Sequence, residues 1–109
     1  MSEQAIPHLQ TKARDTVGIS LMRSAESEAA VEYIEENFPD ASVHDRDVFF
    51  KIERDGKLEF DMNEIGEYLG RELDTDIFLV NMSSYYGRIV VSDGKVEIFS
   101  EIQPERFRD

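Results

Sequence analysis

The sequence contains no cysteine, and it has half as many basic as acidic side chains. The absence of cysteine excludes disulfide bonds, iron–sulfur clusters, cysteine-ligated zinc and thiol catalysis. No apolar run approaches the roughly 20 residues that a membrane-spanning helix requires. The N-terminal stretch MSEQAIPHLQTKARD lacks the apolar core of a secretion signal. We therefore expect a cytoplasmic protein.

The charge balance narrows the range of partners. Twenty-four acidic residues against 12 basic ones give a formal net charge of −12. Such a protein is repelled by nucleic-acid phosphates and by anionic membrane surfaces, and it is attracted to basic protein surfaces. With 109 residues, 40% of them hydrophobic, the chain has the length and apolar content of one folded domain. We expect protein partners, no nucleic acid and no membrane.

Hydrophobic spacing in the first half predicts a strand, a helix and further strands. Residues 17–22 have the composition of a strand, and a helix over 25–38 follows, with Ser24 as its N-cap. Residues 42–54 predict strand, interrupted around 45–47, and Asp55-Gly56 predicts a tight hairpin turn. A short helix over 62–69 should begin after Asp61 and end at Gly70.

The second half predicts mostly strand. Residues 77–82 (IFLVNM) have the pattern of a strongly apolar strand, and 83–87 that of a loop or irregular strand. A hairpin around Asp93-Gly94 follows. The order indicates an α+β fold, a single compact domain with βαββ-type halves, mainly antiparallel sheets and two to three helices. The similar segments DGKLEF and DGKVEIF reflect either an internal duplication or the same turn chemistry used twice.

The expected domain organisation has three parts. A flexible N-terminal arm covers residues 1–14, a core domain covers 15–102, and a charged C-terminal tail covers 103–109. The arm contains a proline and has no apolar period that would dock it on a folded body.

Residues with catalytic or metal-binding potential are few. His8 and His44 are the only histidines, and neither has the spacing that puts two metal ligands on one helical face. Glu28, Glu32 and Glu35 form an acidic stripe, but a carboxylate metal site also needs ligands converging from other helices. We expect surface histidines, a solvated helix face, no metal and no cofactor.

The segment Ser83-Ser84-Tyr85-Tyr86-Gly87 is the exception to an otherwise ordinary pattern. No nucleophile elbow surrounds the serines and no histidine lies near them in sequence, so catalysis is not indicated. The two tyrosines either pack beneath the loop or form a protein-binding hot spot. The residues alone thus favour an acidic recognition module over an enzyme.

Several separated segments carry a resemblance to a known family. They are SVHDRDVFFKI (42–52), GKLEFDMNEIGEYLGREL (56–73) and FLVNMSSYYGRI (78–89). In this order they resemble the MmoB/DmpM family, the effector (regulatory, coupling) components of soluble bacterial multicomponent monooxygenases. The resemblance covers roughly residues 16–102.

The resemblance implies a division of labour. Effectors of this family hold no metal, flavin or catalytic residue; they bind the di-iron hydroxylase, tune oxygen activation and substrate access, and couple NADH use by the reductase to hydroxylation. The residues implied to lie at the hydroxylase face and at the substrate gate are Asn81, Ser83, Ser84, Tyr85, Tyr86 and Arg88. The segments SLMRS, NMSSYYGRI and SEIQPERFRD resemble most the effectors of propane or other short-chain alkane and alkene monooxygenases. The alternative is an acidic module that regulates or inhibits another protein.

Overall fold

The computed structural model describes residues 15–100. The predicted arm (1–14) and tail (103–109) lie outside these residues. The elements are β1 (Thr16–Met22), α2 (Ala25–Asn37), β2 (Ser42–Asp45), β3 (Phe49–Asp55), β4 (Lys57–Asp61), α3 (Met62–Leu69), α4 (Thr75–Val80), β5 (Met82–Tyr86), β6 (Arg88–Ser92) and β7 (Lys95–Phe99).

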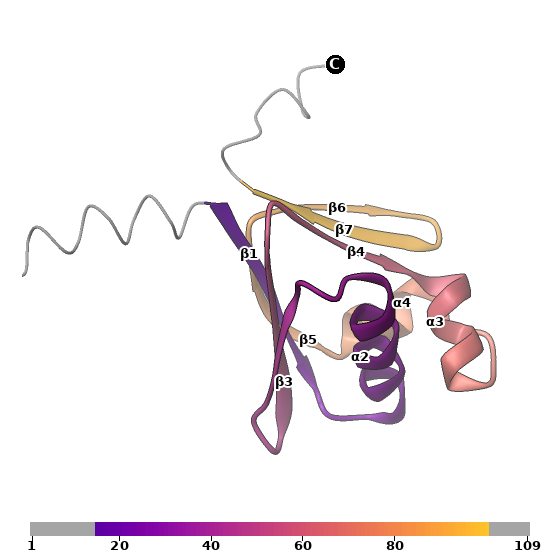
Figure 1. Ribbon diagram of the computed structural model, residues 1–109. Helices are drawn as coiled ribbons and strands as arrows, with labels where there is room; N and C mark the ends of the chain where they lie inside the picture. Colours follow the sequence, from indigo (N-terminus) through magenta and orange to yellow (C-terminus); the bar gives the residue numbers. More distant parts are fainter. Residues whose placement is uncertain (1–14, 101–109) are drawn as a thin grey trace, which may run out of the picture.

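The strands form two antiparallel sheets. The first has the order β2-β3-β1-β5 and the second the order β4-β7-β6. Figure 1 shows the helices gathered beside the four-stranded sheet, with the three-stranded sheet above them. Helix α2 packs against both α3 and β3. The predicted α+β class, the single domain and the mainly antiparallel sheets are confirmed, and three helices occur within residues 15–100.

One hydrophobic cluster joins the two sheets and the helices. The inward-facing side chains of β1, which are Val17, Ile19 and Leu21, are at most 1% exposed. Opposite them, Ile34 of α2 and Phe60 of β4 have no exposed surface. These three residues alternate along β1, as in a strand with one face in the core; on the other face Gly18 is buried and Met22 is exposed.

The residues at the helix ends cap the helices as the sequence predicts. The backbone N–H of Ser27 donates to the Ser24 hydroxyl (3.0 Å) at the start of α2. At the start of α3, the Asp61 carboxylate accepts from the N–H of Glu64 (3.2 Å). Gly70 ends α3 with φ of +87°, a backbone conformation that glycine adopts at little cost.

The predicted hairpin at Asp55-Gly56 is wrong. Strand β3 pairs with β1 and β2, whereas β4 pairs with β7, so the chain crosses from one sheet to the other at Gly56. The N–H of Gly56 donates to the carbonyl of Asp15, and its carbonyl accepts from the N–H of Ser100. The similar segments 55–60 and 93–99 contain β4 and β7, which pair with each other. Only the second segment begins with a hairpin turn, the one that joins β6 to β7.

The predicted strand over 77–82 is also wrong. Residues Thr75–Val80 form the helix α4, and a strand begins only at Met82. Phe78 is buried (1% exposed) against Phe60, with ring centroids 5.0 Å apart, while Ile77 and Val80 are exposed. A six-residue apolar run fits a buried strand and a short helix equally well, and here packing decides for the helix.

Candidate functional site

The segment singled out from the sequence forms β5, an edge strand of the four-stranded sheet. Strand β5 pairs with β1 on one side only, and in the sheet as described its other edge is unpaired. The register shifts between Ser20 and Leu21, where Ser83 is the extra residue of a β-bulge. Bulges bend an edge strand and redirect its side chains. The sequence MSSYY contains no charged residue, so no charged side chain blocks this edge.

The serines of β5 lie far from any histidine that the structure describes. Ser84 pairs with Ser20, which pairs with Lys51, which in turn pairs with His44. Three strand spacings therefore separate Ser84 from His44, roughly 14 Å at the usual spacing. The Ser83 hydroxyl instead donates to the carbonyl of Ser20 (3.3 Å). Within residues 15–100, His44 is therefore too far from Ser84 to act as its general base.

The two tyrosines have different environments. Tyr86 is paired with Gly18, and its ring lies directly on that glycine: a Cβ at position 18 would come within 2.5 Å of the ring. The Tyr86 hydroxyl donates to Glu53, two strands away. Burial, together with this hydrogen bond, raises the pKa of Tyr86 above its usual value. Tyr86 is therefore held across the outer face of the sheet.

Tyr85 has its side chain on the opposite face, because successive residues of a strand alternate. It pairs with the buried Ile19 and remains 43% exposed at the edge of the sheet. Both tyrosines are exposed, Tyr85 at 43% and Tyr86 at 38%, but Tyr86 is fixed by Gly18 and Glu53, whereas Tyr85 lies at the edge of the sheet.

Asn81 and Arg88 flank β5 in different ways. Asn81 ends α4: its side-chain amide donates to the carbonyl of Ile77 (3.0 Å), and its own carbonyl accepts from the N–H of Met22 (2.7 Å). Arg88 begins β6 and pairs with Phe99, so it belongs to the other sheet. Between the two strands, Gly87 has φ of +119° and is packed so tightly that a Cβ would approach the Phe99 carbonyl to 2.9 Å.

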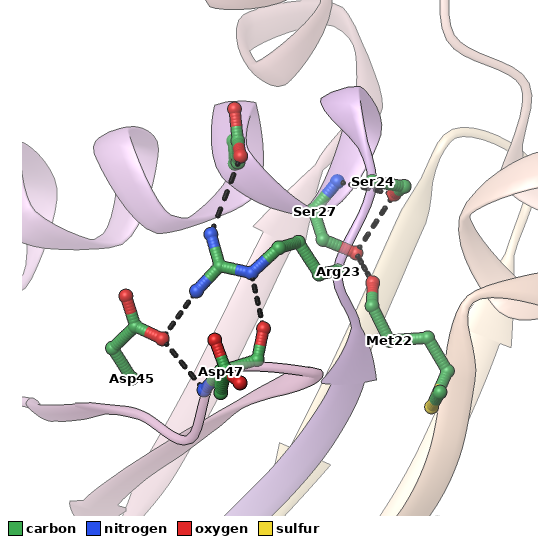
Figure 2. Close-up of polar contacts among 7 residues, drawn as sticks. Met22, Arg23, Ser24, Ser27, Asp45 and Asp47 are labelled. Carbon is green, nitrogen blue, oxygen red and sulfur yellow. Dashed lines mark hydrogen bonds and ion pairs between the residues drawn. The ribbon is translucent and has the colours of Figure 1, made fainter.

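A polar cluster at the end of β1, beside the loop between β2 and β3, was not predicted from the sequence (Figure 2). We call Arg23, Glu28, Asp45 and Asp47 the Arg23 cluster. The guanidinium of Arg23 donates to the Asp45 carboxylate, to the Asp47 carbonyl (2.5 Å) and to Glu28 (3.4 Å). It also lies 4.4 Å from the centroid of the Phe50 ring.

The Arg23 cluster joins two loops and the start of a helix. The hydrogen bond from Arg23, helped by the Asp47 N–H, holds the pKa of Asp45 below its usual value. Asp47 has φ of +74°, the one non-glycine residue with positive φ among those described, and its backbone is held there by Arg23 and Asp45. Because its members are up to 24 positions apart in the sequence, no local sequence motif predicts the cluster.

Three acidic residues of α2 and α3 lie on a surface formed by these two helices. Glu36, Glu64, Glu67, Asn37 and Tyr68 line an open hollow of about 290 Å³ between them. The Tyr68 hydroxyl donates to Glu36 (2.6 Å), which raises the tyrosine pKa to about 12. Within residues 15–100, no group of three or more His, Asp or Glu side chains is arranged to hold a metal ion. None of the helices described is long and apolar enough to cross a membrane.

Comparisons with known proteins identify relatives over most of the chain. A family model described as the MmoB/DmpM family matches residues 15–99. Methane monooxygenase regulatory protein B of Methylococcus capsulatus (strain Bath) is 36% identical over 94 residues, covering 81% of this chain and 67% of the relative. The protein of the same name from Methylosinus trichosporium is 34% identical over 93 residues, with the same coverage.

Solved structures agree with this assignment. The structure of the soluble methane monooxygenase regulatory protein B is 33% identical and covers 87% of this chain and 73% of that one, with a TM-score of 0.63. The regulatory protein in a phenol hydroxylase–regulatory protein complex has a TM-score of 0.69 and covers 77% of this chain and 97% of that one. At 24% identity, the latter similarity demonstrates the shared fold alone.

Proposed function

The chain belongs to the MmoB/DmpM family, and from this premise we propose that it binds the di-iron hydroxylase of a soluble multicomponent monooxygenase and regulates it. Regulatory proteins of this family are non-catalytic auxiliary components, so the expectation that this chain is not an enzyme is confirmed. Because electrons reach such a system from NADH through a reductase, the assembly belongs in the cytoplasm.

The strand β5 supports the proposal most directly. It is an uncharged, bulged edge strand in a molecule of net charge −12, and Tyr85 is 43% exposed on it. An apolar aromatic anchor on a rigid strand is typical of protein-binding hot spots. We propose that Asn81, Ser83, Ser84, Tyr85, Tyr86 and Arg88 form the hydroxylase-binding and gating region. Tyr85 contacts the hydroxylase, and Tyr86 fixes the strand that carries it.

A finer proposal concerns the substrate. We propose that the hydroxylase partner oxidises a short alkane or alkene, on the basis of the sequence segments SLMRS and NMSSYYGRI. Product analysis with propane, propene, methane and phenol as substrates tests this. Faster turnover of methane or phenol than of propane and propene contradicts it.

Sedimentation velocity with the purified hydroxylase tests the binding itself. We expect the chain to co-sediment with the hydroxylase at micromolar concentrations, and to form no product when it is incubated alone with substrate, NADH and oxygen. A hydroxylase whose sedimentation is unchanged when the chain is present far above micromolar concentration would rule out the proposed function, as would turnover by the isolated chain.

A further inference from the structure

Exposed apolar side chains gather at one end of the four-stranded sheet. Met22, Val48, Ile77 and Val80 are 45%, 61%, 44% and 77% exposed, and we call these four the apolar end patch. They come from the end of β1, from the loop before β3 and from α4. Single exposed apolar residues are ordinary, but several on adjoining segments mark an interaction surface.

Main-chain hydrogen bonds place the three segments side by side. The N–H of Met22 donates to the carbonyl of Asn81 (2.7 Å), which directly follows Val80. The N–H of Arg23 donates to the carbonyl of Val48 (3.0 Å). Residues three apart in a helix share a face, so Ile77 and Val80 project together from α4. The patch is therefore built on adjoining backbone.

The Arg23 cluster and a neighbouring hydrogen bond fix the backbone that carries Val48 and Met22. Figure 2 shows the Met22 side chain pointing away from Arg23, on the other side of β1. The carbonyl of Met22 accepts from the Ser27 hydroxyl (2.6 Å), which ties the end of β1 to α2. Arg23 fixes the loop that carries Val48 through its contacts with Asp45 and Asp47. A surface that is already ordered loses less entropy on binding.

The net charge argues against a second copy of the chain as the occupant of the patch. A second copy of the chain would bring another net charge of −12 against the first, which opposes self-association. The four side chains of the patch are uncharged, and the patch continues directly into the uncharged β5 through Asn81 and Met82. Val80 thus lies two residues before the start of β5, and Met22 is hydrogen-bonded beside it at Asn81, so this part of the patch adjoins the proposed hydroxylase-binding strand.

We propose that the apolar end patch is part of the docking surface for the hydroxylase, where it covers an apolar area of that protein beside the site contacted by β5. This inference rests on the proposed function. The proposed contact with the hydroxylase then includes α4 and the end of β1 as well as β5. Because the four side chains are uncharged, their contribution to the binding free energy should not depend on salt concentration.

The test replaces the two most exposed members with serine. For Val48→Ser with Val80→Ser we expect the dissociation constant of the hydroxylase complex to rise at least about tenfold, by a similar factor at low and high salt. Val91→Ser is the matched control, because Val91 is 47% exposed on β6 in the other sheet, and it should leave binding unchanged. Thermal unfolding of each variant verifies folding, and the single variant Val80→Ser serves if the double variant unfolds.

The outcomes separate this inference from the proposed function. If the unmodified chain binds the hydroxylase and the serine variants bind equally well, the patch is not a docking surface and the proposed function stands. If the unmodified chain does not bind the hydroxylase, both the proposed function and this inference are wrong. If the unmodified chain forms dimers that Val80→Ser dissociates, the occupant is a second copy and the inference is overturned.

Discussion

Replacing Tyr85 with threonine is expected to change the performance of the hydroxylase without unfolding the effector. Tyr85 is 43% exposed at the edge of the sheet, so the loss of its ring removes little of the core. If the ring lies at the substrate gate, its removal shifts the relative rates on small and large substrates by up to about tenfold, equivalent to about 1.4 kcal/mol. Product per NADH should fall in the same assay.

Two further variants isolate the role of the Tyr85 ring. Tyr85→Phe keeps the ring and should behave as the unmodified chain does if contact area is what matters. Val91→Ser removes an exposed apolar side chain of the other sheet and should have no effect. Unchanged rate, coupling and substrate range in Tyr85→Thr would show that Tyr85 only packs.

Replacing Phe78 with alanine is expected to be the most destabilising of the changes considered. Phe78 is 1% exposed and its ring contacts Phe60. Removing a buried phenylalanine ring costs about 3–5 kcal/mol. That loss is a large part of the about 5–15 kcal/mol that stabilises a typical domain. Urea unfolding followed by circular dichroism measures the loss.

Val80→Ala is the informative comparison for Phe78→Ala. In a strand the two residues would share a face and the two variants would lose similar stability. In the helix α4, Phe78 is buried whereas Val80 is 77% exposed, so Val80→Ala should change the free energy of unfolding by less than about 0.5 kcal/mol. Equal losses in the two variants would contradict the helix.

Features decided within a few residues could be predicted from the sequence. The N-caps Ser24 and Asp61 act on N–H groups three positions away, and Gly70 supplies the positive φ that ends α3. The alternation of Val48, Phe50 and Ile52 predicts one buried face; Phe50 and Ile52 are buried on β3, whereas Val48 lies in the loop before this strand and is 61% exposed. In each case the interaction that determines the structure is local, so the sequence pattern carries it.

Features decided by tertiary packing could not be predicted. Asp55-Gly56 has the composition of a hairpin turn, but β4 pairs with β7 nearly 40 positions later, and this pairing makes Gly56 a corner between sheets. The apolar run 77–82 becomes a helix because Phe78 reaches Phe60 in the core. Propensity is a weak prior where long-range contacts compete with it.

In the candidate site, too, the sequence predicts local features but not those that depend on tertiary packing. The sequence singles out Tyr85 and Tyr86 together, but only the sheet register separates them: Tyr86 lies on Gly18 and Tyr85 beside Ile19. Arg23 has no distinguishing neighbours in the sequence, and its partners Asp45 and Asp47 are brought to it by the loop before β3. Exposed members of α4 were missed because the run was assigned to a buried strand.

A protein without a reactive centre accelerates a partner only by binding one of the partner's states more tightly than another. A hundredfold effect on rate requires about 2.7 kcal/mol of differential binding. A standard protein interface of about 1,600 Å² supplies that much when a few anchors are well placed. Tyr85 and the apolar end patch are such anchors in this account.

The most direct test titrates the chain into fixed amounts of its hydroxylase and reductase while product formed per NADH consumed is measured. We predict that this ratio rises with the concentration of the chain and then saturates, whereas the chain alone forms no product. A ratio that stays flat across the titration, or product formed without the hydroxylase, would contradict the account.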